Sequence, residues 1–113
     1  MGSRRPELAL ERLAVVLNRS GVEAALHYRY DRIAGREPLT WYADLYVRDP
    51  ATWRMNLLVA GSGGTLPRAA ADCLDWYVMR DLPRAAARLV PAGLRASSLE
   101  ELELKLAARE GAG

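Results

Sequence analysis

Residues 40–60 read TWYADLYVRDPATWRMNLLVA, and this stretch decides the fold. From Thr40 to Arg48, strongly apolar side chains occupy every second position, and this period of two is typical of a half-buried strand. The turn at 49–51 follows, in which the proline fixes one backbone dihedral and the aspartate can bond the backbone beyond it. The alternation resumes from Trp53 to Ala60. Two strands joined by so short a turn predict an antiparallel hairpin.

The alternation also divides the side chains between the two faces of the expected sheet. Those expected in the core are Trp41, Ala43, Leu45, Val47, Trp53, Met55, Leu57 and Val59. Those expected on the outward face, together with side chains of the preceding strand, are His27, Arg29, Tyr42, Asp44, Tyr46, Arg54, Asn56 and Leu58. Tyrosine and arginine are enriched in interfaces, so the outward face is a candidate binding surface.

A helix and a third strand are predicted before the hairpin. From Glu7 to Asn18, apolar residues recur at the i, i+3, i+4 and i+7 spacing of an amphipathic helix, and Gly21 ends it. From Glu23 to Tyr30 the period changes to two, which predicts a strand. The polar segment 31–38, which contains Gly35, is expected to be a loop between the two strands.

A second helix is predicted directly after the hairpin. The segment Gly61-Ser62-Gly63-Gly64 is expected to break the strand, and Thr65 to cap the helix that follows. One side of this helix carries Leu66, Ala69, Ala70, Cys73 and Tyr77. The connection beyond it, punctuated by Pro83 and Pro91, is expected to hold one short helix at 84–89.

The C-terminal end is predicted to be helical as well. Ser98 and Glu101 form a capping box in front of an apolar stripe, so a helix is expected over 99–110. Glu101 and Lys105 stand at the favourable i, i+4 spacing for an ion pair. The leucines at 99, 102 and 106 can dock on this domain or on a second copy. The alternatives are therefore packing of these leucines within one chain and a homodimer through the C-terminal helices.

Together these elements predict an α+β fold, a three-stranded antiparallel sheet with helices packed on one face. The order is α-β-β-β-α plus a C-terminal helical extension. We expect residues 1–80 to form the α-β-β-β-α core and residues 81–113 to extend the same domain. A chain of 113 residues, of which 50% are hydrophobic, is long enough to bury its own core.

The number of cysteines and the distribution of charge limit the classes of function that the sequence supports. Cys73 is the one cysteine and there is no Cys/His cluster of the kind that binds zinc, so no disulfide, metal or cofactor is predicted. Glu7 and Glu11 interrupt any signal-peptide core, and no apolar stretch can cross a bilayer, so we expect a cytoplasmic protein without membrane contact. All 16 basic residues except Lys105 are arginine, and the pI is near 9.0. The arginines are dispersed, unlike the clustered charge of a nucleic-acid tail.

Two known families share part of this pattern. With Gly61-Ser62-Gly63-Gly64-Thr65 followed by Arg68-Ala69-Ala70-Ala71, the chain resembles the double-stranded RNA-binding domain over residues 7–80. That family implies RNA binding through lysines at the start of the second helix, where this chain has Leu66 and Pro67. The chain is also similar around this segment to the HicB-type antitoxin, which uses a partial version of the same fold to block a protein toxin. This second resemblance implies a protein partner.

We therefore predict a non-catalytic binding module that docks on a protein, as a small inhibitor, antitoxin or accessory factor does. The alternative is a nucleic-acid-binding domain that uses the arginine and tyrosine side chains of the sheet face. Trp76 lies off the main stripe of its helix, so it either packs against the C-terminal helices or is an exposed anchor. The residues expected to contact the partner are Arg29, Tyr42, Tyr46, Arg54, Asn56 and Trp76.

Catalysis is the least supported class of function, and no catalytic residue is predicted. His27 is the only histidine, and no Gly-x-Ser-x-Gly elbow or comparable nucleophile accompanies it. Ser62 precedes a helix in a glycine-rich segment, where backbone amides can hold an anion, but the Gly-Lys-Ser/Thr ending of a phosphate-binding loop is missing. Cys73 is expected to be a small core residue.

Overall fold

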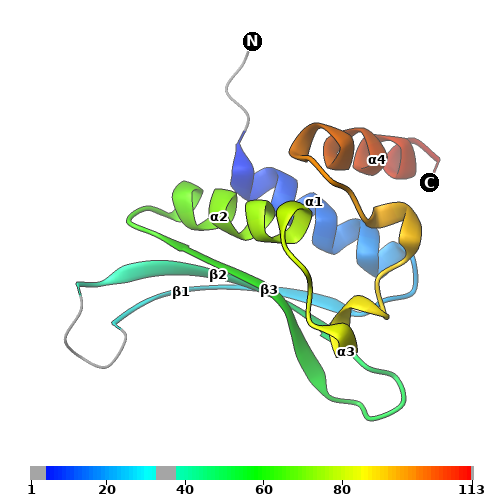
Figure 1. Cartoon of the computed structure of the whole chain (residues 1–113), viewed down its shortest axis with the longest axis horizontal. Helices are drawn as coiled ribbons and strands as arrows, with labels where there is room; N and C mark the ends of the chain where they lie inside the picture. The colour runs from blue at the N-terminus through cyan, green and yellow to red at the C-terminus, as the bar shows by residue number, and fades with distance from the viewer. Residues whose placement is uncertain (1–4, 33–37, 113) are drawn as a thin grey trace.

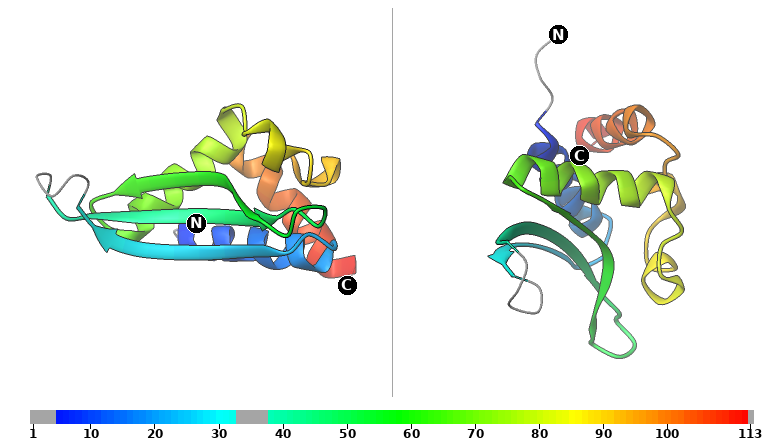
Figure 2. Two further views of the ribbon diagram at one scale, coloured as in Figure 1. Left: turned by 90° about the horizontal axis from the view of Figure 1, so that it is seen from below. Right: turned by 60° about the vertical axis from the view of Figure 1, so that its left-hand side comes forward.

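The computed structural model describes residues 5–32 and 38–112. The helices are α1 (Pro6–Arg19), α2 (Leu66–Met79), α3 (Arg84–Ala87), the 3-10 turn η1 (Ala92–Leu94) and α4 (Leu99–Ala112), and the strands are β1 (Ala24–Asp31), β2 (Thr40–Arg48) and β3 (Met55–Gly63). The strands form one antiparallel sheet in the order β1-β2-β3, with the helices on one side of it (Figures 1 and 2). The predicted α+β fold class is thus confirmed. Gly35, in the predicted loop at 31–38, lies outside the described residues.

The core lies between the sheet and helices α1, α2 and α4. Helix α1 buries the stripe that the sequence predicts, and α4 contributes Leu102 and Leu106, both fully buried. Leu102 and Leu106 therefore pack in this chain's own core, and Leu99 is partly buried against it. The other buried hydrophobic residues that join α1 to the sheet are Leu10, Leu13, Ala14, Leu17, Ala43, Leu45, Val47, Leu58 and Val59.

Helix α2 approaches β3 so closely that glycine is required in the strand. A Cβ atom added to Gly61 would lie 2.1 Å from the backbone N of Cys73 and 2.6 Å from the backbone O of Ala69. The prediction that the glycine segment breaks the strand is wrong, because Gly61–Gly63 continue β3 and pair with β2. These glycines serve the contact between helix and strand. Thr65 caps α2 as predicted, its Oγ accepting from the N–H of Arg68 at 3.3 Å.

A β-bulge in β3 corrects the predicted faces of the hairpin. Leu45 pairs with Val59, but the next residue, Tyr46, pairs with Leu57, so Leu58 is an extra residue in the ladder. The residues of β3 before the bulge therefore face the opposite side of the sheet from the one that strict alternation assigns to them. Leu57 consequently lies on the outward face and is 42% exposed, whereas Leu58, predicted outward, is buried. Met55 likewise shares the outward face, because it pairs with Arg48.

Trp53 lies outside the core, contrary to the prediction. It stands in the turn before β3 with a positive φ of 64°, and 72% of it is exposed. Trp41, which the alternation also assigns to the core, is partly buried against it. The ring of Trp41 packs on that of Tyr30, with the two ring centroids 5.0 Å apart.

The C-terminal segment is anchored by hydrogen bonds to the rest of the fold. Tyr77 of α2 donates from its hydroxyl to the carbonyl of Leu94 in η1 at 2.6 Å. One half of the predicted capping box at the start of α4 forms, with Ser98 Oγ accepting from the N–H of Glu101, whereas the carboxylate of Glu101 accepts from the N–H of Ser97 at 2.6 Å and not from that of Ser98. Lys105 donates to the carbonyl of Arg95. In the part of the chain that the structure describes, no helix is both long and apolar enough to span a bilayer.

Candidate functional site

The face of the sheet opposite the helices is covered by no described element. The left view of Figure 2 shows the three strands in front, with the helices behind them. The register of the strands places a mixed set of side chains on this face: Ala25, His27, Arg29, Asp31, Thr40, Tyr42, Asp44, Tyr46, Arg48, Met55, Leu57, Ala60 and Ser62.

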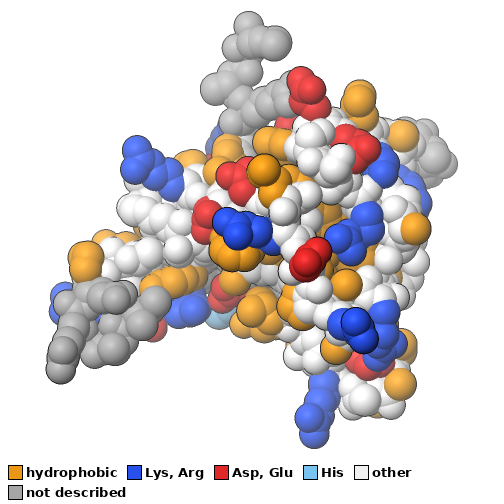
Figure 3. Space-filling model, viewed as in Figure 1, with side chains coloured by type: hydrophobic (Ala, Val, Ile, Leu, Met, Phe, Trp, Pro, Cys, Tyr) orange, Lys and Arg blue, Asp and Glu red, His pale blue; other side chains and the backbone are white. Residues whose placement is uncertain are grey.

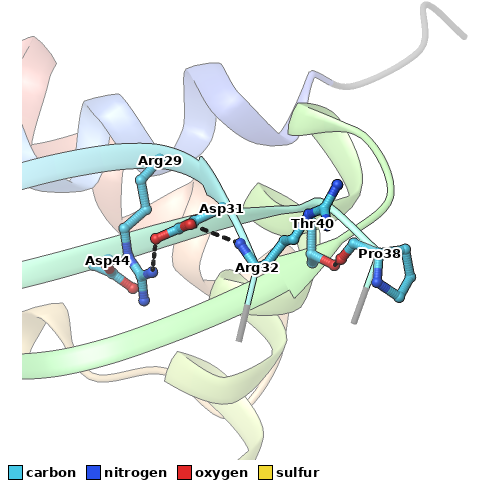
Figure 4. Close-up of polar contacts among 6 residues, drawn as sticks. All are labelled: Arg29, Asp31, Arg32, Pro38, Thr40 and Asp44. Atoms are coloured by element: carbon cyan, nitrogen blue, oxygen red, sulfur yellow. Dashed lines mark hydrogen bonds and ion pairs between the residues drawn. The ribbon is translucent and has the colours of Figure 1, made fainter. Parts of the chain in front are cut away.

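Arg29 organises one part of this face. Its Nε lies 3.2 Å from Asp44 Oδ2 and its Nη1 lies 3.9 Å from Asp31 Oδ2, so the guanidinium is placed between two carboxylates (Figure 4). The same guanidinium lies 4.2 Å above the centre of the Tyr42 ring, a cation–π contact. Tyr42 and Asp44 are therefore only 8% and 4% exposed although they belong to the outward face. The charge of Arg29 and the ring of Tyr42 are already engaged within the chain.

A hollow of about 360 Å³ runs from Arg29 across the sheet face to helix α2. Tyr42, Tyr46, Leu57 and Trp76 line it, so that β1, β2, β3 and α2 all contribute to one surface. Trp76 reaches this surface from the helix beside β3 and is 42% exposed. This exposure agrees with the second of the two predicted settings of Trp76, an exposed position.

A second and more apolar hollow, of about 220 Å³, continues from Trp76 along the edge of β3. We call this hollow, lined by Leu57, Leu58, Val59, Ala60, Trp76, Asp81, Leu82 and Pro83, the Trp76 groove. Hydrophobic side chains reach the surface among acidic and basic ones in the middle of Figure 3, over the region between α2 and α3. Two large apolar side chains of the groove, Trp76 and Leu57, are exposed.

The charges around Trp76 are mainly negative. Asp72 and Asp75 line a neighbouring hollow with Trp76, and Asp81 lies in the Trp76 groove itself. Among the described residues that line these two hollows, the cation is Arg80, whose guanidinium lies 4.3 Å from the centre of the Trp76 ring. Three carboxylates against one guanidinium leave this region acidic on a chain whose formal net charge is +2.

The structure brings together four of the six residues predicted to contact a partner. Arg29, Tyr42, Tyr46 and Trp76 all line the hollow on the sheet face. Arg54 precedes β3 and lines no part of this hollow. Asn56 was expected on the outward face, but it pairs with Val47, a core residue, and so lies on the helix side of the sheet because of the bulge.

Sequence reasoning misses Leu57 and the rest of the Trp76 groove. Strict alternation assigns Leu57 to the core, and only the bulge moves it to the outward face. One signal of the bulge is present in the sequence. Leu57, Leu58 and Val59 are three consecutive apolar residues, which a half-buried strand without irregularity does not need.

The other polar candidates are engaged in structural contacts. The N–H of Ser62, within β3, donates to the carboxylate of Asp72 at 3.0 Å, so this amide does not face an anion site. Cys73 is fully buried, and burial raises the pKa of its thiol to about 12, with smaller contributions from Asp44 and Asp72. A thiol in this setting is not a reactive nucleophile.

Comparison of the chain with models of protein families, with curated proteins and with solved structures gives no match. The resemblances to the double-stranded RNA-binding domain and to the HicB-type antitoxin thus stay predictions.

Proposed function

We propose that this protein is a non-catalytic binding module that docks on another protein through the Trp76 groove and the adjoining sheet face. The observation that carries the proposal is the exposed apolar groove at the edge of an uncovered sheet. Trp76 and Leu57 are each 42% exposed there, and both line the same groove although they come from helix α2 and strand β3. Tryptophan is among the residues that contribute most to interface affinity, commonly about 2 kcal/mol or more when truncated.

The chemistry of the groove indicates the kind of segment it binds. Its floor is apolar, which suits one large aliphatic or aromatic side chain of the partner. Asp81 lines the groove and Asp75 lines the neighbouring hollow that shares Trp76; both are exposed, and no ion pair of either occurs among the described residues. Complementary charges favour association and exclude wrong partners, so we expect lysine or arginine beside the apolar side chain.

The alternative, a nucleic-acid-binding domain, has less support from the same surface. Phosphate binding needs cations, but Arg29 is paired with Asp44 and Asp31, and the border of the groove is acidic. Base stacking needs a free aromatic face, but Arg29 covers that of Tyr42. These contacts favour a protein partner over an RNA or DNA.

Site-specific photo-cross-linking in the native host tests this proposal. A benzophenone amino acid replaces Leu57, in the groove, or Leu104, which is 73% exposed on α4 and serves as the matched control. We expect a protein adduct from position 57 that is absent from position 104 and that weakens when Trp76→Ala is added. Equal adducts at the two positions would argue against the groove as the docking site.

Fluorescence-anisotropy titrations test the alternative directly. The purified protein is titrated with labelled duplex RNA, single-stranded RNA and duplex DNA, each at low and at physiological salt. We expect no saturable binding at micromolar protein. Micromolar binding with a steep salt dependence would instead support the nucleic-acid function, because releasing counterions from phosphates makes affinity fall with salt.

A further inference from the structure

The exposed tryptophan of the β2–β3 turn is held in an unfavourable conformation by a dense set of contacts. Trp53 has a φ of 64°, in the left-handed region, where a bulky residue is a rare outlier. Its N–H donates to the carbonyl of Asp49 at 2.7 Å, and its carbonyl accepts from Arg48 Nη1. The carboxylate of Asp49 in turn accepts from the N–H of Ala51 at 2.8 Å and pairs with Arg88. These contacts fix the backbone of the turn at Trp53.

The side chain of Trp53 contributes little stability to the fold that could offset this strain. It is 72% exposed, so most of its indole contributes no burial to the stability of the isolated chain. Strained backbone that the surrounding structure enforces is concentrated at functional sites. An exposed tryptophan on a backbone held by hydrogen bonds has the properties of an interface anchor.

The charge beside Trp53 is opposite to that beside Trp76. Arg54 follows it directly, is exposed and contacts no carboxylate among the described residues. Arg48, Arg88 and Glu23 line the hollow next to Trp53. Arg48 pairs with Glu23 at 2.9 Å and Arg88 pairs with Asp49, so Arg54 is the cation beside Trp53 without an ion pair among the described residues. We call residues 49–54 the Trp53 turn: it carries a large exposed aromatic side chain next to the guanidinium of Arg54, which is the chemistry that the Trp76 groove would bind through Asp81 and the nearby Asp75.

We propose that the Trp53 turn of one copy of this chain binds in the Trp76 groove of a second copy. Within one chain the contact does not form, because Trp53 lines a separate hollow with residues of the α1–β1 connection and of the segment after α3. The proposal rests on the function proposed above for the groove and adds that self-association occupies it. A protein partner would then compete with a second copy for the same groove.

Each copy carries one Trp53 turn and one Trp76 groove, so the contact is heterologous. In a closed dimer, the Trp53 turn of each copy binds in the Trp76 groove of the other. In an open assembly, each copy binds a further copy and longer assemblies form. In both cases the average mass in solution rises with protein concentration. Added salt lowers this association, since exposed charges contribute to it and salt screens them.

Sedimentation velocity of the full chain over a range of concentrations tests the proposal. We expect the wild type to associate, and Trp53→Ala and Trp76→Ala each to remain monomeric. An equimolar mixture of the two variants should form a one-to-one complex, because one supplies an intact groove and the other an intact Trp53 turn. Leu104→Glu, a change at an exposed leucine elsewhere, should associate like the wild type.

Three results would overturn the proposal: a wild type that stays monomeric, association that survives Trp53→Ala, or a mixture that does not form the complex. A capped Arg-Trp-Arg peptide separates this failure from failure of the proposed function. If the peptide binds Trp53→Ala but not Trp76→Ala while the wild type does not associate, only the self-association is wrong. If the peptide does not bind either variant and the wild type does not associate, the groove chemistry proposed above is wrong as well.

Discussion

Tyr77 is fully buried and Tyr28 partly buried, and their hydroxyl groups, both inaccessible to solvent, have different surroundings. The hydroxyl of Tyr77 donates to the carbonyl of Leu94, whereas that of Tyr28 is buried with no hydrogen-bond partner among the described residues. Tyr77→Phe should lower the free energy of unfolding by about 1–3 kcal/mol, because it leaves a buried carbonyl unpaired. Tyr28→Phe should leave that free energy unchanged or raise it. Urea denaturation of the two variants measures the difference, and equal losses would contradict the assignment.

Burial of three ionisable side chains predicts a loss of stability at alkaline pH. It raises the pKa of Tyr28, of Tyr77 and of Cys73 to about 12 in each case. In the unfolded chain these groups lose their protons at about pH 8.5 for cysteine and about pH 10 for tyrosine. Between these values and about pH 12 the folded state binds more protons than the unfolded state, so the free energy of unfolding falls as pH rises.

Urea titrations at pH 7 and at several values above pH 9 measure this fall. The double variant Cys73→Ala, Tyr77→Phe should show a shallower dependence on pH than the wild type, whatever its stability at pH 7. An identical slope in the two proteins would show that these groups do not carry the effect.

The backbone strain at Trp53 predicts that a substitution there stabilises the isolated chain. Trp53→Gly removes a non-glycine residue from the left-handed region and should raise the free energy of unfolding by about 1 kcal/mol. Thr52→Gly, one residue earlier and without a positive φ, should lower it. Thermal unfolding compares the two variants. A loss of stability in Trp53→Gly equal to that in Thr52→Gly would refute the strain.

At the scale of elements, the contact between α2 and β3 depends on Gly61. Gly61→Ala would place a methyl group within 2.1–2.6 Å of the backbone of α2, so the helix must move away from the strand. We expect a loss of about 3 kcal/mol, at the upper end of overpacking effects. Gly64→Ala is the matched control, because a Cβ there meets nothing within 4 Å, and it should change stability by less than about 0.5 kcal/mol. Urea denaturation distinguishes the outcomes, and similar losses in both would contradict the close approach.

The sequence predicts most elements and their order because local patterns determine them. The bounds of β2 agree with its alternation, and Thr65 and Ser98 mark the starts of α2 and α4 through their capping groups. The end of β3 could not be predicted, because glycines that favour a turn also permit a helix to pack closely on a strand. Only the close approach of α2, which is a tertiary contact, shows that these glycines continue the strand and do not end it in a turn.

At the scale of the whole molecule, the candidate site could be predicted only in part. Arg29, Tyr42 and Tyr46 follow from the alternation of β1 and β2, which run without irregularity. One extra residue, Leu58, reverses the faces of the start of β3, so Leu57 joins the site and Asn56 leaves it. The shielding of Tyr42 by Arg29 depends on a cross-strand contact that composition does not reveal.

The charge pattern of the site likewise emerges only in three dimensions. Along the chain the arginines and aspartates alternate without clear blocks, and the formal net charge is +2. In the fold, Asp81 lines the groove at Trp76 and Asp75 lines the neighbouring hollow, whereas Arg54, next to Trp53, is exposed and has no ion pair among the described residues. This separation is the basis for expecting a basic partner segment at the groove.

The measurement that tests the central claim most directly is selection of peptides from a random library on the immobilised protein. The affinity of the enriched peptides for the wild type and for Trp76→Ala is then determined by calorimetry. We predict peptides that carry an aromatic or large aliphatic residue beside lysine or arginine, with affinity lost by at least tenfold in Trp76→Ala and retained in Leu104→Glu. Enrichment of acidic peptides, or equal affinity for the wild type and Trp76→Ala, would contradict the assignment of the Trp76 groove as the docking site.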